Sequence, residues 1–95
     1  MSAGDLRVEV VEVRGRCPAF RVGDAFYIRR GFLLEAEGPL CLHALCSILP
    51  YYVALSRGIE PAELGLGEGA AHVQCLDPCE RTGGGTVIFR IVAVK

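Results

Sequence analysis

The sequence predicts a small α+β domain in which two strands, one long helix and two further strands follow one another. Apolar and polar side chains alternate in short segments, as in half-buried strands. One longer segment is apolar around most of a helical circumference, as in a helix covered on several sides. We expect a mainly antiparallel sheet packed on this helix. The 95 residues form a single domain, 1–95, and residues 1–5 are expected to be a disordered tail.

The first strand is predicted at Leu6–Arg14. Its apolar residues occupy even positions as far as Val10 and odd positions from Val11 onward, so the alternation shifts by one residue. A β-bulge at Val10–Val11 would keep both halves facing the same way. The alternative is a strand that is buried on both faces.

The other strands are marked by turn residues on either side. The turn residues Gly23 and Asp24 precede the second strand, Ala25–Arg30, and Gly31–Gly38 is predicted to be a loop. After the helix we expect a loop with one helical turn around Pro61–Leu64. The third and last strands are predicted at Ala71–Leu76 and Thr86–Val94, joined by the turn-rich segment Asp77–Gly85. The last strand is apolar on both faces apart from Arg90, which is typical of an interior strand.

The helix is predicted at Leu40–Arg57, with Pro39 in its first turn and Gly58 just after its end. Pro50 removes one backbone hydrogen bond, so a kink or a break into two short helices is expected there. The positions that are not large and apolar form one stripe at helical spacing: His43, Ser47, Pro50, Ala54 and Arg57. One sheet covers only one face of a helix, and we therefore expect the remaining apolar surface to meet another copy of the chain.

Composition excludes several classes of protein. The net charge is −1, which argues against a nucleic-acid partner. The longest apolar stretch is interrupted by His43, Ser47 and Pro50, so no membrane-spanning helix is predicted. The segment Met1–Arg7 lacks the apolar core of a signal peptide. These observations predict a cytoplasmic protein in which cysteines stay reduced.

Five cysteines are the residues that best suit a chemical role. Cys75 and Cys79 flank a turn at a spacing that is able to chelate one ion, and Cys17 and Cys41 stand at element boundaries. Spacing therefore allows a metal or thiol site of Cys17, Cys41, Cys75 and Cys79, holding zinc or an iron–sulfur cluster. The alternative is that the cysteines are buried apolar filler.

Signals for catalysis are weak. His72 and Cys75 fall on opposite faces of their strand, and His43 lies on the polar helix stripe, so a Cys–His pair is not favoured. A strand follows Gly83-Gly84-Gly85, whereas a phosphate-binding loop leads into a helix, so these glycines predict a hairpin turn. No catalytic residue is assigned.

Three motifs span most of the chain: Cys17-Pro18-x-Phe20-x-x-Gly23-Asp24-x-Phe26, Cys41-x-x-Ala44-Leu45-x-x-Ile48-x-Pro50-Tyr51-x-x-Ala54-Leu55-x-x-Gly58 and Cys75-x-Asp77-Pro78, followed by Val87-x-Phe89-x-Ile91. On these motifs the chain resembles a family of small, uncharacterised bacterial and archaeal proteins of about this length. The resemblance implies no activity. It places Cys17, Cys41 and Cys75 within the pattern and leaves Cys46 and Cys79 outside it, which implies a site of Cys17, Cys41 and Cys75 with Cys79 as a candidate fourth ligand.

Three hypotheses for function follow from these observations. The first is a cysteine-based module that binds a metal or a cluster or responds to redox conditions. The second is a homo-oligomeric interaction or scaffold protein without an active site. The third is a small enzyme with a pocket beside Pro50, Tyr51 and Tyr52; an enzyme is the less favoured class.

Overall fold

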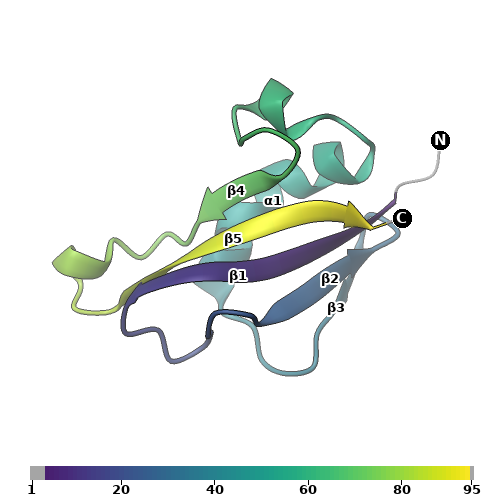
Figure 1. Cartoon of the computed structure of the whole chain (residues 1–95). Helices are drawn as coiled ribbons and strands as arrows, with labels where there is room; N and C mark the ends of the chain where they lie inside the picture. The colour runs from purple at the N-terminus through teal and green to yellow at the C-terminus, as the bar shows by residue number, and fades with distance from the viewer. Residues whose placement is uncertain (1–3, 95) are drawn as a thin grey trace.

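The structure, a computed structural model, describes residues 4–94. Its five-stranded antiparallel sheet has the order β3-β2-β1-β5-β4, and helix α1 packs on one face of it (Figure 1). The elements are β1 (Asp5–Gly15), β2 (Ala25–Arg29), β3 (Leu33–Glu35), α1 (Leu42–Ser56), the 3-10 turns η1 (Pro61–Leu64) and η2 (Cys79–Arg81), β4 (Ala71–Gln74) and β5 (Gly85–Val94). The predicted α+β class, the turn around Pro61–Leu64 and the interior position of the last strand are confirmed.

The predicted bulge in the first strand is present. The pairing of β1 with β5 shifts register between Val10 and Glu12, and Val11 is the extra residue. The shift lets even positions before it and Val13 after it face the core. Of the tail expected at residues 1–5, residues 1–3 lie outside the described range, and Asp5 is already the first residue of β1.

The predicted loop Gly31–Gly38 contains a strand that was missed, β3, at one edge of the sheet. β2 and β3 form a hairpin whose tip holds Arg30 and Gly31 in the left-handed region, at φ 58° and 82°. The amide of Phe32 donates to the Arg29 carbonyl at 3.1 Å. Arg30 is unusual there, because left-handed backbone favours glycine and asparagine.

Asp5 ties this hairpin tip to β1. Its carboxylate accepts hydrogen bonds from the Arg30 amide at 2.8 Å and from the Arg29 guanidinium at 3.1 Å. The Arg30 amide, followed by the Arg29 side chain, lowers the pKa of Asp5 below its ordinary value. The strained tip is therefore held by a charged anchor from the neighbouring strand.

α1 begins two residues later than predicted, with Cys41 at its N-cap and Pro39 outside it. It continues through Pro50 as one element and does not break into two helices. At its C-terminus Gly58 has φ 90°, and the amides of Gly58 and Ile59 donate to the carbonyls of Leu55 and Ala54. The predicted glycine stop is thus confirmed.

The face of α1 that meets the sheet differs from the predicted one. Ser47 was assigned to a polar stripe, but it is buried at 8% exposure, and its hydroxyl donates to the Ala44 carbonyl at 2.6 Å. This bond satisfies the hydroxyl locally, so the residue is able to sit against the sheet. The side chains left outside are apolar: Leu42 is 70% exposed, Leu49 53% and Val53 48%.

The core lies between α1 and one face of the sheet, with Phe89 of β5 at its centre. Phe20 and Phe26 meet the Phe89 ring edge-on, with centroids 5.4 and 6.4 Å away. Alternate residues of β1, β2, β4 and β5 complete it, whereas ion pairs such as Arg7–Glu9 occupy the opposite face. In the described part of the chain, no helix is long and apolar enough to cross a membrane.

Replacing Arg30 with Asn should stabilise the protein. A left-handed residue costs about 1–2 kcal/mol for most side chains and less for Asn, so Arg30→Asn should raise the free energy of unfolding by about 0.5–1 kcal/mol in denaturant titration. Arg21→Asn is the control, because Arg21 is exposed and has no positive φ. An equal gain in both variants would show that the backbone of Arg30 is not strained.

Candidate functional site

The structure places Cys17, Cys75 and Cys79 of the predicted site near one end of the sheet, where β1 ends and β5 begins. Cys75 is a buried member of the core, and Cys17 and Cys41 are half-buried against it. Cys79 lies across from the end of β1. Cys46, outside the predicted site, is exposed on α1, and all five thiols are free.

In the described part of the chain these cysteines are not grouped as the ligands of a metal ion. Across residues 4–94, no three Cys, His, Asp or Glu side chains form a group that could hold a metal ion. The structure thus brings Cys17, Cys75 and Cys79 to one end of the sheet, Cys41 packs against the core at the N-cap of α1, and no ligand set joins them among residues 4–94. The zinc or iron–sulfur module stays a prediction.

Cys79 has a structural role that the sequence did not indicate. Its sulfur lies 3.5 Å from the Arg14 carbonyl oxygen and 3.7 Å from that of Gly84, and the thiol donates to these acceptors. Its amide donates to the Asp77 carboxylate at 2.9 Å, and the Thr82 hydroxyl donates to the same oxygen. We call Asp77, Cys79 and Thr82 the loop latch, since they hold the β4–β5 connection against β1.

The loop latch alters the acidity of Asp77. The hydroxyl of Thr82 is the largest cause that lowers the pKa of Asp77, and the Cys79 amide and the charge of His43 act in the same direction. The ionised carboxylate is therefore the form that the folded loop favours.

Of the three consecutive glycines, Gly84 and Gly85 are explained by close packing, and Gly83 by its left-handed backbone at φ 76°. A Cβ on Gly84 would lie 2.5 Å from an Asp77 carboxylate oxygen, and one on Gly85 would lie 2.5 Å from the Arg16 carbonyl carbon. β5 begins at Gly85, so the glycines lead into a strand, as expected, and offer no helix N-terminus for a phosphate.

The predicted enzyme pocket beside Pro50 is present only in part. Pro50 and Tyr51 line a cavity of about 350 Å³ together with Cys46 and His72, whereas Tyr52 points to a different one. Within the described residues, no carboxylate lines this cavity. It lacks the acid group that would have strengthened the enzyme hypothesis.

An apolar groove lies on the other side of α1, between the helix and the β2–β3 hairpin. It has a volume of about 120 Å³ and almost no polar surface. Its lining, which defines the apolar groove below, is Ile28, Phe32, Leu34, Leu45, Ile48, Leu49 and Tyr52. Phe32 on its rim is 65% exposed and Leu34 is 50% exposed. The sequence predicts a loop at Gly31–Gly38 and therefore does not place Phe32 and Leu34 at a sheet edge, although the apolar run between Gly31 and Glu35 indicates a short strand.

The apolar groove continues along the exposed face of α1. Leu42, Leu49 and Val53 recur at helical spacing and form a stripe that meets the groove at Leu49. Asp, Glu, Lys and Arg are all absent from Leu42–Ser56. A helix face that is solvated throughout normally carries charged side chains, so this composition is typical of a covered surface.

Comparison of the chain with protein-family models, with curated proteins and with solved structures gives no match. Function is therefore inferred from the geometry of the molecule.

The five thiols should react at very different rates. Cys46 should react first with a thiol reagent and Cys75 only on unfolding, because Cys46 is exposed and Cys75 is buried.

Asp77→Ala should accelerate modification of Cys79 several-fold by releasing the loop latch, with Cys46 in the same sample as control. Peptide mapping by mass spectrometry measures each rate. An unchanged rate at Cys79 would mean that the latch does not restrain the loop.

The free energy of unfolding should fall in acid because Asp77 becomes protonated. The pKa of Asp77 in the folded chain lies below its unfolded value of about 3.9. Its contribution to the free energy of unfolding is therefore complete above the unfolded pKa and is lost as the pH falls through the folded pKa. The difference in unfolding free energy between the natural chain and Asp77→Ala should therefore narrow below about pH 4. A difference that is constant with pH would show that the charge of Asp77 does not contribute.

Proposed function

We propose that this chain is a self-associating interaction protein whose partner is a second copy of itself. The apolar groove and the Leu42–Leu49–Val53 stripe support the proposal, because together they leave a continuous apolar surface exposed on a single chain. It corresponds to the second hypothesis drawn from the sequence. It retains the expected cytoplasmic compartment and the absence of a nucleic-acid partner.

The absence of charge on α1 favours a second copy over an unrelated partner. In a two-fold dimer the same surface patch is used by both chains, so a charged group near the axis meets its own like charge. α1 carries no Asp, Glu, Lys or Arg over its whole length, and His43 is outside both the lining of the apolar groove and the stripe, so the paired helix surfaces avoid this repulsion. The α1 surfaces of two copies are thus electrostatically compatible, and Arg30, whose guanidinium lies 5.7 Å from the centroid of the Phe32 ring, is a charged group beside the rim of the groove.

Shape also fits a second copy. Phe32 is 65% exposed at the rim of the apolar groove, whose volume of about 120 Å³ is somewhat below the about 150 Å³ of a cavity that holds benzene. In the proposed dimer, the exposed part of each Phe32 ring packs into the groove of the other copy while the residue still lines its own groove. A standard interface covers about 800 Å² of each partner, which is a modest share of the 6093 Å² that this chain exposes.

The proposal predicts a dimer that depends on Leu49 and Phe32. At about 100 μM, above the dissociation constant of a typical standard interface, sedimentation equilibrium should give twice the chain mass of 10.2 kDa. Leu49→Glu and Phe32→Ser should each weaken association at least tenfold, because Leu49→Glu places like charges across the two-fold axis and Phe32→Ser removes the inserted ring.

Leu76→Glu is the matched control, because Leu76 is 59% exposed and lies outside the apolar groove and the stripe. It should leave the dimer intact, and circular dichroism should show that all three variants fold. A monomeric natural chain, or equal weakening by Leu76→Glu, would overturn the proposal. Near-stoichiometric zinc or iron in anaerobically purified protein, with cysteines protected, would instead support the metal hypothesis.

A further inference from the structure

The cavity beside Pro50 and Tyr51 forms a cleft between α1 and the edge strand β4. Its volume is about 350 Å³, and it is lined by α1 between residues 46 and 51, by Leu66 and by the chain between residues 72 and 76. We call it the α1–β4 cleft. It shares no lining residue with the apolar groove, which lies on the other side of the helix. Pro50 is exposed and Leu76 is 59% exposed, and among the described residues no Asp, Glu, Lys or Arg lines the cleft.

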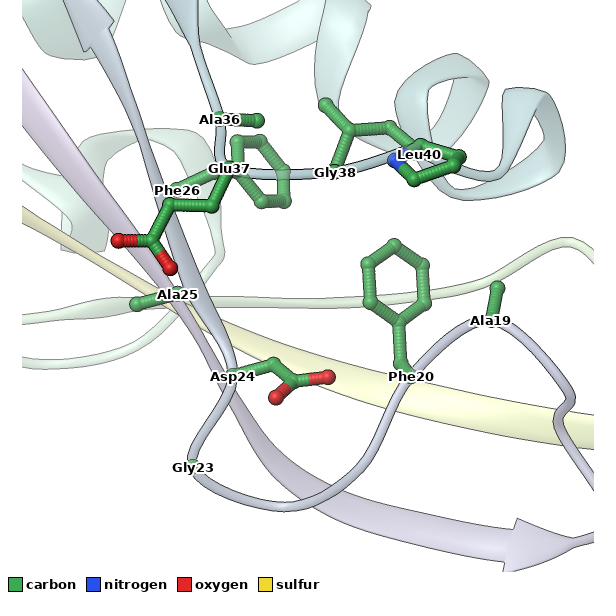
Figure 2. Close-up of a pocket in the computed structure, with 11 residues that line it drawn as sticks. Ala19, Phe20, Gly23, Asp24, Ala25, Phe26, Ala36, Glu37, Gly38 and Leu40 are labelled. Atoms are coloured by element: carbon green, nitrogen blue, oxygen red, sulfur yellow. The ribbon is translucent and has the colours of Figure 1, made fainter.

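A larger cavity, of about 400 Å³, lies between residues 19–26 and 36–40 (Figure 2). Phe20 and Phe26 line it, but they are only 6% and 2% exposed, because both rings pack edge-on against a third ring in the core. A ligand there would meet little apolar surface. The α1–β4 cleft offers more, since several of its lining side chains are exposed.

The outer edge of β4 adjoins the cleft and is free to pair. Among the described residues β4 pairs only with β5, at one end of the sheet order (Figure 1). The Cys75 amide donates to the Val87 carbonyl of β5, whereas the His72 amide points away from β5 and donates to the Leu66 carbonyl, both at 2.8 Å. Main-chain groups of alternate residues point to the same side of a strand. The amide and carbonyl of Gln74 therefore point outward, as those of His72 do.

Nothing in β4 blocks the addition of a strand. Exposed edges are commonly protected by lysine, proline or a bulge, and Ala71–Gln74 contains none of these. The side-chain amide of Gln74 donates to the Thr86 hydroxyl of β5 at 3.3 Å, so this side chain is held away from the edge. Only at His72 does the chain use the edge itself, through the Leu66 carbonyl. The edge at Gln74 remains open.

We propose that the α1–β4 cleft binds an extended segment of another protein, which adds to β4 as an antiparallel strand and places apolar side chains in the cleft. The Gln74 amide donates to this segment and the Gln74 carbonyl accepts from it, as in other cases of strand addition. A helix satisfies its own main-chain groups, so the free edge favours an extended segment. The charge-free lining favours apolar side chains in the cleft.

A second copy of the chain fits this edge less well than an independent segment. Pairing of two β4 edges about a two-fold axis would place the Leu66 segment of each copy at the junction, because that segment already occupies the edge at His72. A segment that begins opposite Gln74 and runs past Leu76 avoids this obstruction.

A capped pentapeptide of alternating threonine and leucine is the probe. Opposite Gln74 in an antiparallel pair, threonine amides point to β4 and leucine side chains point to the cleft, whereas leucine amides point away. Titration into the isotopically labelled full chain should give saturable amide shifts confined to residues 46–51, Leu66 and residues 72–76. N-methylation of the threonine amides should weaken binding by about tenfold or more, since it removes main-chain hydrogen bonds. N-methylation of the leucine amides is the matched control and should leave the affinity unchanged.

Two variants separate this site from the proposed dimer. Leu76→Glu should weaken peptide binding by about fivefold or more, because it places a charge in an apolar lining, and should leave the dimer intact. Leu49→Glu lies outside the cleft and should weaken the dimer without affecting peptide binding. The proposal is wrong if no saturable binding occurs, if the two N-methylated peptides bind equally, or if Leu76→Glu binds as the natural chain does. Shifts at residues 72–76 that grow with protein concentration in the absence of peptide would assign the edge to a second copy, and would contradict it too.

Discussion

A single helix is too narrow to cover a five-stranded sheet, and the apolar surface left exposed on this molecule follows from that difference in width. Strands lie about 4.8 Å apart, so the outer strand axes are separated by roughly 19 Å, whereas a helix with its side chains is about 10–12 Å wide. α1 packs chiefly on β1, β5 and β4 (Figure 1). At the β4 edge the segment after η1 adds cover, and the Leu66 carbonyl accepts from the His72 amide. The helix-side face at β2 and β3 is left as the apolar groove.

Local patterns predicted most of the fold because they report local physics. Alternation and flanking turn residues predicted four strands, the shift in alternation predicted the bulge at Val10–Val11, and Gly58 marked the end of α1. β3 was missed because its three residues are all exposed and show no alternation. The prediction for Ser47 was wrong for another reason. Helical spacing shows which side chains share a face, but tertiary packing decides whether that face is covered. Ser47 tolerates burial because its hydroxyl donates to a carbonyl of its own helix.

The candidate sites were harder to predict than the fold. The sequence indicated that cysteines stand at element boundaries, and the structure indeed places Cys17, Cys75 and Cys79 near one end of the sheet. Whether sulfur atoms converge depends on distances of a few ångströms between segments far apart in the chain, which spacing alone does not specify. The same limit applies to the α1–β4 cleft, whose walls come from separate elements of the chain. In contrast, the sequence alone predicted that the helix would carry apolar side chains that its own sheet does not cover, because most of the helix residues are apolar. Leu42 and Leu49 are exposed, in agreement with that prediction.

The bulge in β1 does more than restore the facing of one strand. Pairing of β1 with β2 ends at Glu9 and Ala25, and immediately afterwards the Val10 amide donates to the Asp24 carbonyl while the Val10 carbonyl accepts from Gly23. The segment that carries Phe20 and Asp24 is thus anchored where β1 changes register. Deletion of Val11 would leave Glu12 directly after Val10 and opposite Ile88, so the ladder with β5 would run without a bulge and Val13 would still face the core. The extra residue therefore bends β1 locally, at the point where its pairing with β2 has ended and the Gly23–Asp24 turn is anchored.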